Sequence, residues 1–183
     1  MKTKMFFFAL ALLCTSLTYA QKTVMVGGEA MYPSKNIVEN AINSKDHTTL
    51  VAAVKAAELV STLQSEGPFT VFAPTNDAFE NLPEGTVATL LKPENKAALQ
   101  GVLTYHVVAG RYSAADIIAL IKKSKGGMAK LTTVAGGSLT AMMNGPMNVV
   151  LQDENGNTAN IITYDVNQSN GVIHTIDAVV LPK

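Results

Sequence analysis

Two polar residues, His174 and Asp177, interrupt the apolar stretch GVIHTIDAVVLP (171–182) near the end of the chain. An imidazole and a carboxylate are groups that general acid–base catalysis uses often. In a β-strand, however, side chains alternate between the two faces, so these two residues point to opposite sides. His174 shares its face with Val172 and Ile176, which predicts a buried, neutral imidazole with hydrogen-bond partners. The pair therefore indicates a structural role.

A second polar pair, Tyr105 and His106, precedes Val107 and Val108 at the start of a predicted strand. His106 is compatible with a ligand contact or a general base, and equally with a hydrogen-bonded junction between a helix and a sheet. One end of a tyrosine can stay in water while its ring packs, so Tyr105 is the best candidate for a surface contact.

Metal-binding patterns are incomplete in this chain. The three histidines have no close ligand spacing. Asp153, Asn155 and Asn157 resemble the start of a calcium loop, but Thr158 replaces the required glycine and Tyr164 the closing glutamate, so a hairpin turn is expected. No metal ligand is predicted.

Other signatures of catalysis or ligand binding are weak. Ser138 follows two glycines but lacks the strand–turn–helix setting of a nucleophile elbow. No phosphate loop or dinucleotide fingerprint occurs, so no catalytic residue and no cofactor is predicted. Methionines 142, 143 and 147 could bind Cu(I), but methionine on a strand usually fills space.

Residues 1–20, MKTKMFFFALALLCTSLTYA, have the composition of a secretory signal peptide. Two lysines precede a nine-residue apolar run that is too short to span a membrane, and cleavage is expected after Ala20. A lipoprotein signal at Cys14 is the alternative, although Leu13 stands where a small residue is expected. The prediction is export to the periplasm or beyond.

The remaining 163 of the 183 residues suit one domain with its own core. Loss of Lys2 and Lys4 leaves 12 basic against 14 acidic residues, and no basic block survives that would bind nucleic acid. Because the only cysteine is Cys14, the exported chain has no disulfide, and its stability rests on packing.

Periodicity and turn residues predict helices first and a β-rich half second, which is an α+β arrangement. Thr75 and Asp77 suit the cap and first turn of a helix after the first strand. Residues 21–33, a short lead segment before the first predicted helix, are expected to form an added edge strand or an extended tail. The helices are predicted at 34–42 with Ser34 as N-cap, from Asp46 or Thr48 through Leu63 to the break at Gly67-Pro68, and at 86–92, 94–104 and 113–123. The strands are predicted at 69–73, 105–109, 128–134, 138–143, 147–152, 159–166 and 171–181.

Three stretches, TVFAPTNDAF (70–79), YHVV (105–108) and GVIHTIDAVVL (171–181), resemble the signature boxes of the fasciclin (FAS1) domain family. NIVENA and TTLVAAVKAAELV resemble its beginning, so the chain divides into a signal peptide (1–20), an extension (21–35) and a bacterial-type fasciclin domain (36–183). The resemblance implies a wedge-like β-sandwich flanked by helices, with the first and last boxes as neighbouring core strands. One departure is His47, where the family often has an aromatic residue.

The resemblance also implies an exported adhesion module that binds a protein or matrix component and is not an enzyme. In animal members the Tyr-His region is linked to integrin contact, which by position implies Tyr105, His106, Val107 and Val108 as partner-binding residues. Thr75, Asp77, His174 and Asp177 are then structural motif residues. A monomer is expected. The alternatives are a receptor for a small apolar ligand, with a pocket near the three methionines, and a hydrolase that uses His106.

Overall fold

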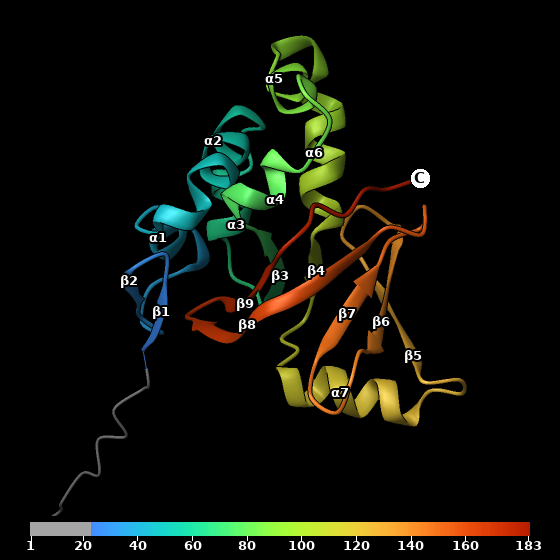
Figure 1. The fold of residues 1–183 in the computed structure, drawn as a ribbon. Helices are drawn as coiled ribbons and strands as arrows, with labels where there is room; N and C mark the ends of the chain where they lie inside the picture. Colours follow the sequence, from blue (N-terminus) through green and yellow to red (C-terminus); the bar gives the residue numbers. More distant parts are fainter. Residues whose placement is uncertain (1–22) are drawn as a thin grey trace, which may run out of the picture.

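The structure, a computed structural model, describes residues 23–183. The predicted signal peptide and Cys14 lie outside the described residues. One seven-stranded sheet forms the centre, with α1 to α6 gathered on one side of it and α7 beneath the β5–β7 end (Figure 1). This confirms the α+β class. Within residues 23–183, no helix has the length and apolar content to cross a membrane.

The helices are α1 (Ile37–Ala41), α2 (Thr48–Ala56), α3 (Val60–Gln64), α4 (Asn76–Glu80), α5 (Thr86–Leu90), α6 (Lys96–Tyr105) and α7 (Ala114–Lys123). The strands are β1 (Val24–Val26), β2 (Glu29–Met31), β3 (Phe69–Pro74), β4 (Val107–Ala109), β5 (Met128–Thr132), β6 (Ser138–Met143), β7 (Val149–Gln152), β8 (Thr158–Gln168) and β9 (Gly171–Ile176). The lead is therefore neither an edge strand of the main sheet nor a tail, because β1 and β2 pair with each other as a separate hairpin.

The strand order of the large sheet is β4-β3-β9-β8-β7-β6-β5. All neighbours are antiparallel except β3 and β9, which run parallel with Phe72 opposite His174. The two ends of the sheet meet where Val108 pairs with Thr133 and the Val134 N–H donates to the Val107 carbonyl at 2.7 Å. The sheet thus curls into a nearly closed barrel, which leaves few unpaired edges.

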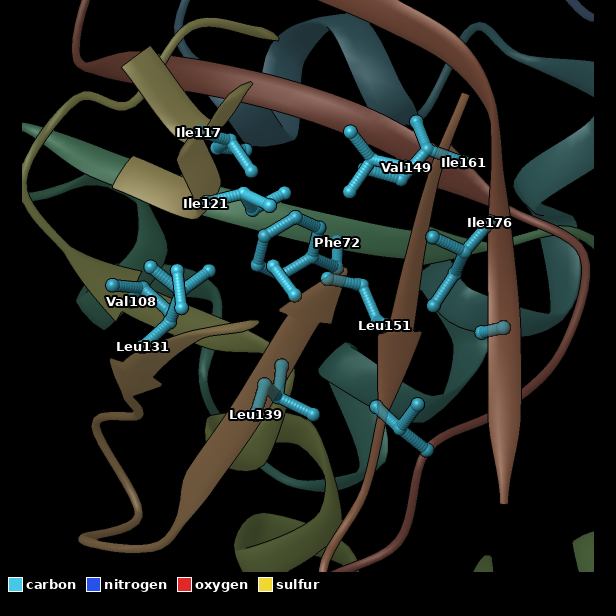
Figure 2. Packing of buried hydrophobic residues seen from close by; sticks show 14 of the residues in the cluster. Phe72, Val108, Ile117, Ile121, Leu131, Leu139, Val149, Leu151, Ile161 and Ile176 are labelled. Atoms are coloured by element: carbon cyan, nitrogen blue, oxygen red, sulfur yellow. The ribbon is translucent and has the colours of Figure 1, made fainter. Parts of the chain in front are cut away.

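Side-chain alternation along β3 divides the interior into two cores. Phe72 points into the barrel, where Ile117 and Ile121 of α7 and Leu151 of β7 pack around it (Figure 2). The flanking Val71 and Ala73 point the other way and pack with α1, α2 and α6. The first signature box therefore contributes to both cores, and a one-residue shift of β3 would exchange its two faces.

Two helix boundaries differ from the sequence predictions for reasons that the hydrogen bonds and backbone angles show. Asn36, and not Ser34, caps α1: its Oδ1 accepts from the Glu39 N–H, and the Glu39 carboxylate accepts from the Asn36 N–H. The predicted long helix from residue 48 to Leu63 is split, because Glu58 adopts a left-handed φ of 57°. The Leu59 N–H then bonds the Val54 carbonyl, which ends α2 as glycine-type caps do.

The cap of α4 provides a direct stability test. The Thr75 hydroxyl accepts from the Ala78 N–H at 3.3 Å, which confirms Thr75 as the N-cap. Thr75→Ala is expected to lower the free energy of unfolding by about 1 kcal/mol, measured by urea denaturation. Ser34→Ala is the matched control, because this exposed serine does not cap α1, and its unfolding midpoint should not move. Equal midpoints for wild type and Thr75→Ala would contradict the cap.

Candidate functional site

His174 joins three separate segments at the centre of the sheet. It is fully buried, and its ring stacks on Phe72 with centroids 5.7 Å apart. Its Nδ1 accepts from the Asp165 N–H at 3.3 Å, so the proton resides on Nε2, which donates to the Tyr112 carbonyl at 2.8 Å. Burial lowers the pKa of His174, and the Tyr112 hydrogen bond only partly opposes this shift. The imidazole is neutral, buried and hydrogen bonded.

Asp165 presents its N–H to His174 because β8 is irregular at this point. Asp165 has a φ of 55°, and the pairing of β8 with β9 shifts register between Thr163 and Val166. The Asp165 carboxylate accepts from the Ala114 N–H at 2.7 Å, in the first turn of α7. The bulge therefore fastens β8 to β9 on one side and to α7 on the other.

His106 uses the opposite tautomer at the junction of α6 and β4. Its Nε2 accepts from the Val180 N–H at 3.2 Å, so Nδ1 carries the proton and donates to the Val102 carbonyl at 2.8 Å. Burial lowers the pKa of His106 to about 4, with the Val102 bond acting in the other direction. His106 connects the end of α6 to the chain that follows β9, and both of its ring nitrogens are occupied.

Tyr105 is the last residue of α6 rather than the first of a strand, and it is fully buried. Its hydroxyl donates to the Ser138 carbonyl at 2.8 Å and accepts from the Glu154 N–H at 3.2 Å. Gly137 lies directly against the ring, since a Cβ there would stand 2.8 Å from Tyr105 Cε2. The hydroxyl that was expected to stay in water instead ties α6 to the first residue of β6 and to the turn after β7.

The four residues implied as partner contacts are therefore all inside the protein. Tyr105 is 0% exposed, His106 and Val108 are 3% exposed, and Val107 is 6% exposed. A partner has no access to their side chains in this structure. Their role in partner binding stays a prediction.

The carboxylates of Asp177 and Asp153 accept hydrogen bonds from nearby backbone N–H groups. Asp177 follows β9, and its carboxylate accepts from both the N–H and the side-chain amide of Asn160, each at 2.7 Å. Asp153 accepts from the Asn155 and Asn157 N–H groups at 2.9 and 2.8 Å, as the expected hairpin turn requires. Among residues 23–183 there is no group of three metal-ligating side chains.

The comparisons with known proteins identify the family. Residues 45–182 match the family model of the fasciclin domain. The chain belongs to the Fasciclin domain family. The three sequence boxes thus correspond to β3 with the start of α4, to the α6–β4 junction, and to β9 with its continuation.

Relatives of this fasciclin domain occur in bacteria. The protein sll1483 of Synechocystis is 48% identical over 163 residues, covering 88% of this chain and 82% of the relative. The immunogenic protein MPB70 of Mycobacterium bovis is 36% identical, covering 78% of this chain and 66% of the relative. A solved FAS1 domain pair from the insect cell adhesion molecule fasciclin I superimposes with a TM-score of 0.69 at 18% identity, over 80% of this chain and 51% of that one.

The fasciclin domain also contains a feature that the sequence did not reveal. An apolar cavity of about 110 Å³ lies in the helix-facing core, and His47 is among the residues that line it. The pocket expected near the methionines is not where this cavity lies, since Met142 and Met143 are half-buried on β6 and Met147 is 72% exposed. In the sequence, His47 was visible as a departure from the family pattern. The cavity beside it arises from packing between segments that are far apart in the sequence.

Proposed function

We propose that this fasciclin domain is an exported, monomeric, non-catalytic adhesion module that binds a protein or matrix component at the cell surface or outside the cell. Membership of the Fasciclin domain family carries the proposal. The fold shared with domains of an insect cell adhesion molecule supports it. The signal-peptide composition of residues 1–20 supports export.

The state of the polar residues in the signature boxes supports a module without catalysis. A general base needs a ring nitrogen that can reach a substrate proton. Both nitrogens of His174 and both of His106 are engaged with the backbone. The Tyr105 hydroxyl and the Asp177 carboxylate are engaged in the same way. These groups hold the fold together.

We further propose that the Tyr-His stretch binds a partner through the loop that it supports. The Val134 N–H donates to the Val107 carbonyl, and the Ala135 N–H donates to the Thr104 carbonyl at 3.3 Å. Ala135 is exposed, so its side chain is available to a partner where those of residues 105–108 are not. The contact surface in this proposal is the loop 133–137, which these two hydrogen bonds hold in place.

An attachment assay with matched variants tests this proposal. A strain lacking the gene is complemented with wild type, Ala135→Glu or Ala115→Glu, and attachment of cells to a surface is measured. Both alanines are exposed, so neither charge should unfold the domain. Ala135→Glu is expected to reduce attachment several-fold because it buries a charge in the contact, whereas Ala115→Glu, on α7, should attach like wild type.

The outcomes separate the three parts of the proposal. Equal attachment by both variants would remove the loop 133–137 as the contact surface. Equal attachment by the gene deletion and the wild type would overturn adhesion itself. Turnover of ester, glycoside or peptide substrates by the purified protein would overturn the non-catalytic role.

A further inference from the structure

The apolar cavity lies in the core between the helices and the outer face of the sheet. Its wall includes Ile37 of α1, Leu50 and Val54 of α2, Val71 of β3 and Ile173 of β9. These five side chains are between 3% and 9% exposed, so this part of the wall belongs to the folded interior, whereas Ile42 and Val134, which also line the space, are 51% and 47% exposed. A wall of this kind offers water no hydrogen bonds, and apolar cavities stay dry while accepting hydrocarbon guests.

The volume of the cavity limits the size of a ligand. An engineered cavity of about 150 Å³ lined by Leu, Ile and Phe takes up benzene or xenon. The cavity here, at about 110 Å³, is of the same order. Sites for drug-sized ligands are larger, about 300–1,000 Å³. The cavity therefore fits a single small ring or a short branched hydrocarbon.

The charge state of the surroundings limits the chemistry of a ligand. His47 is 3% exposed, and its Nδ1 lies 2.8 Å from the Ser44 hydroxyl. Burial lowers the pKa of His47, so the ring beside the cavity is neutral at neutral pH. Lys55 lines the same space, but it is exposed and its ammonium group can stay in water. Without a buried counter-charge, an ionised ligand would lose its hydration uncompensated.

The segment that covers the cavity is weakly held. Val60 and Leu63 of α3 line the space, yet α3 has no buried residue and no side-chain cap at its N-terminus. The short helix follows the left-handed Glu58. Segments with few buried contacts open locally at the lowest free energy. Displacement of α3 gives a small molecule a route into the core without global unfolding.

From these observations we propose that the cavity beneath α3 is a binding site for a small, uncharged, apolar molecule of about the size of benzene. The adhesion proposal concerns a different feature, the exposed Ala135 side chain, although Val134 of the loop 133–137 also lines the cavity. A failure of either proposal leaves the other in place, because one concerns an internal space and the other an exposed surface.

Benzene is the probe for the test, and sodium benzoate is the matched charged ligand. Thermal unfolding of the wild-type protein is followed at rising ligand concentration, since a ligand that binds only the folded state raises Tm with its concentration. Benzene should raise Tm in this way, and benzoate at the same concentrations should not. Chemical shifts of the Leu50 and Val71 methyl groups should move with benzene.

Two variants change the cavity in opposite directions. Val54→Phe fills it and should weaken benzene binding at least about tenfold, whereas Leu50→Ala enlarges it and should retain or strengthen binding. Thr75→Ala is the control, because it destabilises the domain away from the cavity and should bind benzene like wild type. Absence of a benzene-dependent change in wild-type Tm and methyl shifts would overturn the proposal, whether or not Val54→Phe folds. Undiminished binding to folded Val54→Phe would also overturn it.

Discussion

Replacement of His174 with leucine is expected to lower the free energy of unfolding by about 2–6 kcal/mol. Leucine fills a similar volume but cannot donate to the Tyr112 carbonyl or accept from the Asp165 N–H. Each backbone group left without a partner in the interior costs about 1–3 kcal/mol. The loss should appear in urea denaturation as a lower midpoint with an unchanged slope.

The next residue along β9 supplies a control with the same burial. Thr175 is 2% exposed, and its hydroxyl has no hydrogen-bond partner within residues 23–183. Thr175→Val removes that hydroxyl at nearly constant shape, so stability should stay constant or rise by up to about 1 kcal/mol. A loss for Thr175→Val equal to that for His174→Leu would mean that any substitution in β9 is harmful, and that the hydrogen bonds of His174 are unimportant.

Acid is expected to destabilise the domain between about pH 6.5 and pH 4. All three histidines are buried, and each has a pKa below its usual value of 6.5. In this window the unfolded chain binds more protons than the folded one, so stability is complete above pH 6.5 and falls as the pH falls. For His106, whose pKa is about 4, the loss approaches about 3 kcal/mol.

Unfolding free energies measured in urea at pH 7.5, 6.0 and 4.5 check this expectation. Asp116, whose pKa is lowered by its hydrogen bonds with Ser113, loses its contribution only below its usual value of 3.8, outside the window. His106→Gln should be less stable than wild type at pH 7.5, and its stability should fall less steeply toward pH 4.5. A wild-type stability that is constant between pH 7.5 and 4.5 would contradict the burial of neutral imidazoles.

Local patterns in the sequence were sufficient for the core strands. Alternation placed His174 on an apolar face, and the order Pro74-Thr75-Asn76-Asp77 marked the end of β3 and the start of α4. The family resemblance supplied what alternation does not contain, namely that the first and last boxes are neighbours. Their parallel pairing, with Phe72 opposite His174, confirms that implication.

Features that depend on distant partners were missed. Tyr105 looked like a surface residue because a tyrosine can keep its hydroxyl in water, but the Ser138 carbonyl and the Glu154 N–H satisfy that hydroxyl inside the protein. Glu58 gave no sign of a helix end, since glycine is the usual residue for a left-handed cap. The cavity beside His47 is a property of packing between α1, α2 and the sheet, and no local pattern encodes it.

The central claim is that the histidines of the signature boxes are uncharged fold-building groups with fixed and opposite tautomers. Long-range ¹H–¹⁵N NMR spectra of the imidazole rings test it most directly. The structure requires the proton of His174 on Nε2 and that of His106 on Nδ1, with the His106 ring still neutral at pH 5.5 and the pKa of His174 below its usual value. Either ring titrating near pH 6.5, or the two rings sharing one tautomer, would contradict the claim.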